Sequence, residues 1–406
     1  MFKRTIPTSA PLYIVLLGLI SALPPLAIDM GLPGLPQIQT EFQSYSAAYI
    51  LTFFLFGFSI GPIIFGPLSD IYGRKPILLL GLALFSASAI GCSLASSMDA
   101  LLILRLIQGI GAGAAAALPS AIVRDVFTGN MALKRQSYVA MVNGMAPLIA
   151  PIIGAVVLMI GNWRTIYDVL AIFGLMLFIF CYLSYSETAP PFIKSSKNNK
   201  TLSSIFMSYL EVLTNRTYIF STILLALAFG SMFSYIISSS TVFMVELGSS
   251  ATLYGFLFAF TALGGILGAA FNVRFASKIG AERLLKIAIY SSFLVSLGLC
   301  LIAWLDQISV INCALLILIN NFFIGIILPN TTVRALQDMG NVAGSAAALQ
   351  RSLQMTIGAF AGVLVSLVEM GPSFSMTISM IFFSLLSIVI LFIETRSKRS
   401  ERFNIS

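Results

Sequence analysis

Apolar residues in this chain come in long blocks of about 20, the length that an α-helix needs to cross the hydrocarbon core of a bilayer. Short segments rich in Gly, Pro and charged residues separate these blocks. The pattern predicts an all-α membrane protein. The twelve predicted transmembrane helices cover residues 11–32, 46–68, 77–95, 100–123, 137–160, 165–185, 217–240, 251–272, 284–304, 309–330, 342–368 and 373–393.

The longest hydrophilic interruption lies close to the middle of the chain, from Ser186 to Asn215. It predicts two pseudo-symmetric six-helix halves, residues 1–185 and 217–406, joined by a cytoplasmic linker over residues 186–216. Parallel repeats of six helices are a known transporter architecture. A weak internal repeat agrees with duplication, because the spacing of Gly66 and Asp70 recurs in Gly268 and Asn272.

Composition excludes a soluble globular protein, because only 9% of the residues are charged and 58% are hydrophobic. All but three of the 23 Lys and Arg lie in segments that are cytoplasmic if the N-terminus is inside; the exceptions are Arg105, Arg164 and Arg351. The positive-inside rule therefore predicts that both termini are cytoplasmic. Because the bases are scattered through short loops, the net charge of +8 does not indicate a nucleic-acid partner.

Cysteine and histidine usage limits the chemistry. The four Cys all lie within apolar runs without CxxC spacing, so neither a disulfide framework nor a metal site is predicted, and no cofactor is expected. The chain has no His, which leaves carboxylates for proton chemistry near neutral pH. A cleaved signal peptide is the alternative for the first apolar run, but the many later spans favour a first transmembrane helix.

Two charged residues stand inside predicted spans of the first half. Asp29 lies in LPPLAIDMGLPGLPQ, whose four Pro are expected to break the helical hydrogen bonds, and Arg105 stands alone among apolar residues, one turn before Gln108. Both lie in the outer part of the bilayer by residue count. We expect them to pair and to form an ion pathway, because intramembrane charges are costly. The alternative for Asp29 is a carboxylate in water at the outer end of its helix.

The run GPLSDIYGRKPI, residues 66–77, predicts a tight polar loop between two long apolar runs. It resembles the loop 2-3 signature of the major facilitator superfamily, except that Ile71 stands where the family often has a base. The resemblance implies a latch on the cytoplasmic face, in which Arg124 and Asp125 join the loop; a solvated ion pair is the alternative. The predicted latch residues are Gly66, Asp70, Gly73, Arg74, Arg124 and Asp125.

Two further segments resemble motifs of the same superfamily. RLIQGIGAGAAAA resembles its helix 4 signature, in which the Arg, here Arg105, is tied to proton coupling. NGMAPLIAPIIGA resembles the antiporter signature of helix 5, with Ala150 and Ala155 at two glycine places. The predicted motif residues are Pro147, Pro151 and Gly154, and the two prolines are expected to kink or stiffen the helix. The small residues of helix 4 are also explained by close helix packing.

Polar residues within spans provide candidates for a substrate cavity. They are Gln108, Tyr235, Asn320, Asn321, Gln350, Arg351 and Gln354. Hydrogen bonds between helices are an equally good explanation for most of them. Arg351 lies near the midplane without an acidic partner that the sequence suggests, which favours an anionic ligand, although it can also snorkel towards the inner water.

Taken together, these segments resemble the Bcr/CflA subfamily of bacterial drug:proton antiporters along nearly the whole chain. The resemblance implies a transporter, not an enzyme, that exports drugs or toxic metabolites across the inner membrane as protons enter. Its partners would be a small-molecule substrate, protons and the lipid bilayer, and we expect a monomer. A channel, an intramembrane enzyme and a sensor or scaffold are less favoured alternatives. The main alternative is a dedicated exporter of an anionic metabolite, such as a carboxylate siderophore.

Overall fold

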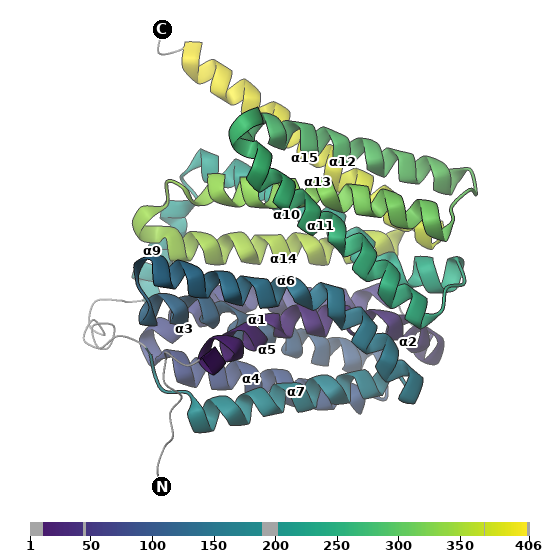
Figure 1. Ribbon diagram of the computed structural model, residues 1–406, viewed down its shortest axis with the longest axis horizontal. Helices are drawn as coiled ribbons and strands as arrows, with labels where there is room; N and C mark the ends of the chain where they lie inside the picture. The colour runs from purple at the N-terminus through teal and green to yellow at the C-terminus, as the bar shows by residue number, and fades with distance from the viewer. Residues whose placement is uncertain (1–10, 44–45, 189–201, 369, 404–406) are drawn as a thin grey trace. The chain divides into compact units, whose positions relative to one another are not determined.

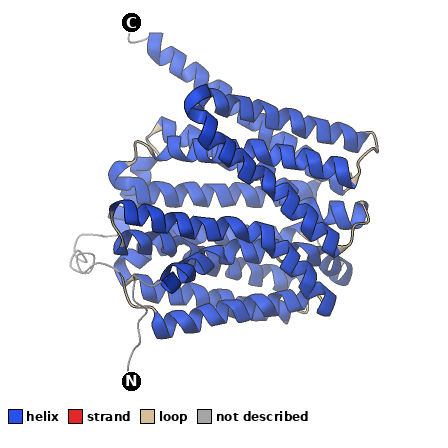
Figure 2. Cartoon of the chain, in the orientation of Figure 1, coloured by secondary structure: helices blue, strands red, loops and turns tan. Residues whose placement is uncertain are grey.

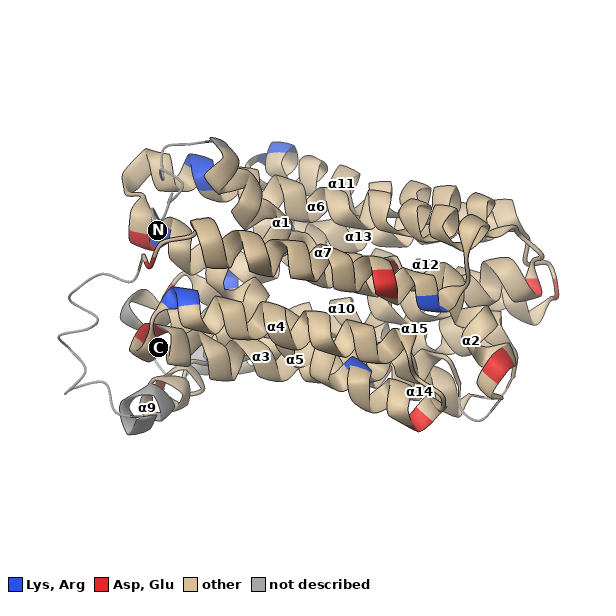
Figure 3. Ribbon diagram, turned by 90° about the horizontal axis from the view of Figure 1, so that it is seen from below, with Lys and Arg blue, Asp and Glu red and all other residues tan. Residues whose placement is uncertain are grey.

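The computed structural model describes residues 11–43, 46–188, 202–368 and 370–403, and helices account for most of them (Figures 1 and 2). The run SSKNNK of the predicted linker lies outside the described residues. The chain separates into two compact units, Met1–Ser208 and Tyr209–Ser406. Figure 3 shows that charged residues gather towards the ends of the helices.

The first unit contains the six helices predicted for the first half of the chain. Its elements are α1 (Pro11–Asp29), the 3₁₀ helix η1 (Leu32–Gly34), α2 (Leu35–Phe42), α3 (Ala48–Tyr72), α4 (Arg74–Ser93), α5 (Met98–Val126), α6 (Gly129–Ile160) and α7 (Trp163–Ser184). Several helices are longer than predicted, because polar helix ends extend beyond the apolar runs. The helix α6, for example, begins at Gly129 and not at residue 137.

The second unit repeats this order. Its elements are α10 (Arg216–Ser240), the π-helix η3 (Thr241–Glu246), α11 (Ala251–Ile279), α12 (Ala281–Trp304), α13 (Val310–Leu336), the 3₁₀ helix η4 (Gly340–Val342), α14 (Ala343–Leu367) and α15 (Pro372–Phe403). A further helix, α9 (Leu202–Val212), occupies part of the predicted linker, so residues 186–216 are not all loop. Within the described residues, eleven helices are long and apolar enough to cross a membrane. The remaining long helix, α14, has a polar first half.

Helix packing within the two units follows one plan. In the first unit α1 packs on α6, α3 on α5 and α4 on α7; in the second unit α10 packs on α14, α11 on α13 and α12 on α15. Sequential helices of each unit therefore occupy corresponding places. The all-helical architecture with two pseudo-symmetric six-helix halves is confirmed.

Glycines bring the helices of one pair into backbone contact in each unit. A side chain at Gly57 of α3 would meet the carbonyl oxygen of Leu106 on α5, and one at Gly264 of α11 would meet that of Leu318 on α13. Gly57 and Gly264 are therefore the equivalent positions. The sequence analysis instead aligned Gly66 with Gly268, and the two alignments of the halves differ by five residues. The spacing of only two residues can recur by chance, whereas a backbone contact between corresponding helices is a structural equivalence.

We expect Gly57→Ala to lower the free energy of unfolding by about 1–3 kcal/mol, because the added methyl group must push two backbones apart. Gly264→Ala should behave alike in the second unit. Gly144→Ala in α6 is the matched control, since nothing lies within 4 Å of its added Cβ. Thermal unfolding in detergent measures the difference, and equal midpoints for Gly57→Ala and Gly144→Ala would contradict the tight contact.

The segment 66–77 is not the predicted polar loop. The helix α3 continues through Pro67 to Tyr72, and α4 begins at Arg74, so Gly73 alone forms the junction. Its φ of 101° and ψ of 156° favour glycine strongly. Pro76 lies in the first turn of α4, where a missing N–H costs nothing. Counting turn-forming residues therefore overestimated the length of the connection.

Candidate functional site

The first helix breaks directly after Asp29. Pro24 and Pro25 lie within α1 and do not end it, contrary to the expectation that every Pro of this segment interrupts the helix. The chain leaves the α-helical path at Met30 and continues through η1 into α2. A helix that ends within a span leaves its last carbonyl groups without helical partners, and these must be satisfied by other groups.

Gly154, from the predicted antiporter motif, lies against this break. A Cβ at Gly154 would collide with the Met30 carbonyl oxygen and would lie 3.0 Å from the Pro33 side chain. Pro147 and Pro151 are both accommodated within a continuous α6. The motif thus provides the small surface that lets the broken end of α1 approach α6.

The Asp29 side chain is buried at this break, with 3% of the residue exposed. In the part of the chain that the structure describes, its carboxyl group has no hydrogen-bond or ion-pair partner. A carboxylate in such a site is costly unless it is compensated, whereas a protonated carboxyl group costs much less.

Arg105 of α5 is buried nearby and binds the end of α1. Its Nη2 donates to the carbonyl oxygen of Ala27 at 3.3 Å, and its Nη1 donates to Gln108 Oε1 at 2.7 Å. The guanidinium carbon lies 4.3 Å from the centre of the Phe54 ring and 5.6 Å from that of Tyr167. A cation at the C-terminus of a helix is favoured by the helix dipole, and aromatic faces attract it further.

The predicted ion pair between Asp29 and Arg105 is not formed in this structure. The guanidinium instead uses two backbone carbonyls, the Gln108 side chain and two aromatic rings. The Nε2 of Gln108 is buried and has no hydrogen-bond partner among the described residues. The site therefore holds an uncompensated acid, a satisfied cation and one free amide donor around the same break.

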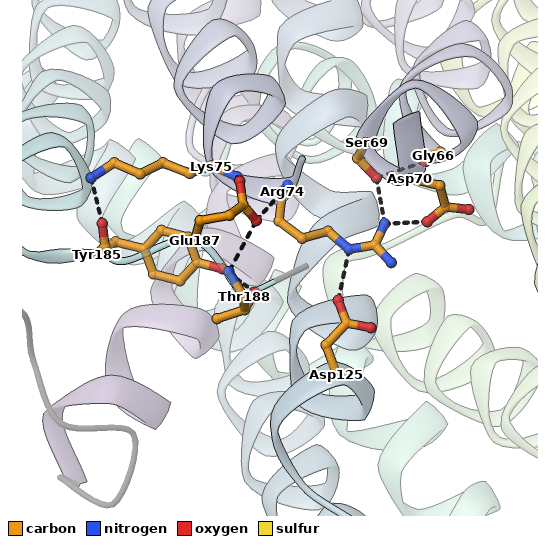
Figure 4. Close-up of polar contacts among 9 residues, drawn as sticks. All are labelled: Gly66, Ser69, Asp70, Arg74, Lys75, Asp125, Tyr185, Glu187 and Thr188. Atoms are coloured by element: carbon orange, nitrogen blue, oxygen red, sulfur yellow. Dashed lines mark hydrogen bonds and ion pairs between the residues drawn. The ribbon is translucent and has the colours of Figure 1, made fainter. Parts of the chain in front are cut away.

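A network of charged and polar side chains forms around Arg74, where the sequence predicts the latch (Figure 4). The Arg74 side chain is 7% exposed and lies between two carboxylates, with Nη1 2.5 Å from Asp70 Oδ1 and Nε 2.8 Å from Asp125 Oδ2. Nη1 also donates to Ser69 Oγ at 2.6 Å. Gly66 takes part only through its carbonyl oxygen, which accepts from Ser69. Arg124 is exposed and bonds to no described residue, so the structure does not bring it into the network.

Glu187, just after α7, completes this cluster and was missed by the sequence analysis. Its Oε1 accepts from the backbone N–H of Arg74 at 2.9 Å and its Oε2 from that of Lys75 at 3.2 Å, so it caps the start of α4 (Figure 4). The Lys75 ammonium group in turn donates to the carbonyl oxygens of Tyr182 and Tyr185. No motif pointed to Glu187, because its partners lie more than 100 positions earlier.

Removing the Arg74 cation is expected to destabilise the first unit. In Arg74→Met the carboxylates of Asp70 and Asp125 face each other without a cation, which should cost about 2 kcal/mol, because Asp70 is partly exposed. Arg124→Met is the matched control on the same surface, with an expected effect within about 0.5 kcal/mol. Equal unfolding midpoints of the two variants in detergent would show that the network does not hold these helices together.

Three polar candidates of the second half are used for contacts between helices. Tyr235 of α10 shares a 2.6 Å hydrogen bond with Thr261 of α11, and Asn321 of α13 donates to the Thr261 carbonyl oxygen at 3.0 Å. Asn320 accepts from Ser292 of α12 at 2.7 Å. All three candidates are buried. This arrangement is the interhelical alternative considered for them.

The remaining candidates lie together on α14. Gln350 is buried and its Nε2 has no hydrogen-bond partner within the described ranges, whereas Arg351 is exposed and Gln354 is half-buried. Neither Arg351 nor Gln354 has a hydrogen bond or ion pair with a described residue.

Glutamates tie the ends of the first and last helices of each unit, and sequence reasoning missed these contacts too. Glu41 of α2 accepts from the Trp163 ring at 2.7 Å and binds Arg164 at the start of α7. Glu246, at the end of η3, accepts from the backbone N–H of Ser373 at 2.8 Å at the start of α15. The repeated contact is further evidence for equivalent halves.

Long apolar helices in two equivalent sets of six define a multi-pass membrane protein. The model of the Major Facilitator Superfamily matches residues 17–363. The chain therefore belongs to the major facilitator superfamily, whose members carry small molecules across membranes. A bacterial homolog to the human lysosomal transporter Spinster, solved in an inward-facing and occupied conformation, has the same fold, with a TM-score of 0.71 and 15% identity over 96% of this chain and 98% of that one.

Two relatives agree with the predicted subfamily. The bicyclomycin resistance protein homolog of Haemophilus influenzae is 29% identical over 377 residues, which is 91% of this chain and 92% of that protein. The multidrug resistance protein MdtL of a Shewanella species is 29% identical over 292 residues, 70% of this chain and 71% of that protein. The resemblance to the Bcr/CflA subfamily is thereby confirmed.

Proposed function

We propose that this protein is a proton-coupled antiporter that exports small molecules, including drugs, across the bacterial inner membrane, as a monomer with both termini in the cytoplasm. The observation that carries the proposal is the buried Asp29 carboxyl group at the break in α1, which bonds to no residue in the described part of the chain. The names of two relatives, which refer to bicyclomycin resistance and multidrug resistance, support drugs as substrates.

Coupling follows from the two protonation states of Asp29. The protonated carboxyl group is tolerated in the observed arrangement, in which Arg105 binds the Ala27 carbonyl oxygen. Loss of the proton creates a buried carboxylate, which is compensated if Arg105 leaves Ala27 and turns to Asp29, two residues further along the chain, with the free amide of Gln108 as a second donor. Because the two protonation states favour different positions of Arg105 at the end of α1, we infer that proton binding and substrate binding act on one conformational equilibrium.

Everted membrane vesicles containing the full chain provide the test. With the interior acidified by respiration, addition of bicyclomycin or ethidium should release protons from the vesicles, which the dequenching of acridine orange reports. Collapse of the pH gradient with nigericin should stop ethidium uptake. Uptake that continues after the gradient is collapsed would refute proton coupling.

A further inference from the structure

Arg351 of α14 is a cation within a predicted span, and it pairs with no residue that the structure describes. It lies eight residues after the first residue of α14, which is about 12 Å along the helix axis. It makes no hydrogen bond or ion pair with any described residue, and its side chain is exposed. This contrasts with Arg105, which is buried and satisfied by carbonyl oxygens, an amide and aromatic rings.

Within the second unit, the helices that pack on α14 offer Arg351 no unpaired acid among their described side chains. Neither α14 nor α10, on which it packs, contains Asp or Glu. On α15, which also contacts α14, Glu394 is paired with Arg334 of α13. An ionised side chain within a span is expensive unless it faces a wet path and meets a counter-charge there.

The two neighbouring glutamines add donors to the same part of α14. Gln350 precedes Arg351 and has a buried Nε2 without a partner, and Gln354 follows three residues later, on the adjacent turn. Leaving a buried amide donor unpaired costs free energy, and an acceptor that arrives with a ligand recovers it. The free groups that characterise this site are thus a guanidinium and an amide N–H donor.

We propose that Arg351, with Gln350 and Gln354, forms a subsite for the carboxylate of an organic anion carried by this transporter. The inference rests on the proposed export function and specifies its substrate class. A guanidinium holds a carboxylate through two parallel hydrogen bonds, which a point charge such as Lys cannot reproduce.

The test uses the purified full-length protein and three matched pairs of probes, the carboxylates and carboxamides of benzene, naphthalene and biphenyl. Isothermal titration gives the affinity of each. The wild type should bind at least one acid about tenfold more tightly than its amide. Arg351→Gln should remove that preference while its affinity for the amide stays within about twofold of the wild-type value. Arg351→Lys should retain part of the preference. Arg274→Gln is the matched control, because Arg274 is an exposed cation on α11 that bonds to no described residue.

The same preparations, reconstituted in liposomes, are tested for ethidium uptake driven by a pH gradient. Uptake by the wild type without any preference for an acid over its amide would overturn the anion subsite and leave the proposed export function standing. An equal fall of acid and amide binding in Arg351→Gln would likewise overturn it. Absence of gradient-driven ethidium uptake would contradict the proposed export function, and the proposed substrate subsite would then be rejected as well.

Discussion

Asp29→Asn is expected to abolish proton-coupled export while the folded protein remains in the membrane. The amide has nearly the same shape as the carboxyl group, so the packing of Gly154 on the break after Asp29 is retained. It cannot ionise, so the step that would draw Arg105 away from Ala27 is lost. Transport that needs no net proton movement, such as exchange of labelled for unlabelled drug, should persist.

The measurement is the proton release that drug addition causes in everted vesicles, together with drug exchange in the same vesicles. Asp168→Asn is the matched control, because Asp168 is also an acid near one end of an apolar helix, α7, but is exposed. Proton release of normal size in Asp29→Asn would exclude Asp29 from coupling. If proton release is lost in Asp168→Asn and retained in Asp29→Asn, the coupling residue is Asp168 on α7.

Arg105→Met is expected to be the most destabilising single substitution proposed for the first unit. It leaves the Ala27 carbonyl oxygen at the end of α1 and Gln108 Oε1 without their donor, and each such buried group costs about 1–3 kcal/mol. It also removes the attraction of the cation to Phe54, which is worth up to about 2 kcal/mol in a desolvated site. The total loss should therefore be about 3 kcal/mol or more.

Thermal unfolding in detergent measures this loss, and transport measures its consequence. Arg283→Met is the control, because Arg283 is exposed and bonds to no described residue, so its effect should lie within about 0.5 kcal/mol. Arg105→Lys should keep the charge but lose part of the contacts, and it should fall between the two. If Arg105→Met unfolds at the same temperature as Arg283→Met, the cation does not hold the end of α1.

The course of the helices was predictable because it depends on local quantities. The free energies of transfer of the side chains from water to hydrocarbon add up along an apolar run. A block such as residues 217–240 therefore identifies the helix α10 without knowledge of its neighbours. The ends were less predictable. Pro67 and Asp70 suggested a loop, yet both lie in α3, where the Asp70 carboxylate is paired with the cation of Arg74.

The polar partners were less predictable than the helices. Residue type and depth led to an expected pair of Asp29 and Arg105, whereas the guanidinium binds the carbonyl oxygen of Ala27, which is free only because α1 breaks there. The presence of a carbonyl acceptor cannot be read from side-chain chemistry. In the same way the sequence offered Tyr235 and Asn321 as cavity residues but could not show that both form hydrogen bonds with Thr261.

The sequence by itself determined that this protein crosses the membrane many times, that it consists of two six-helix halves, and that it belongs with a family of transporters. Each of these follows from hydropathy or from motifs within a single segment. Only the tertiary structure decided that Glu187 caps α4, that Gly154 supports the break after Asp29, and that Arg351 bonds to none of the described residues. These outcomes depend on contacts between residues far apart in the chain, for which local spacing contains no physical information.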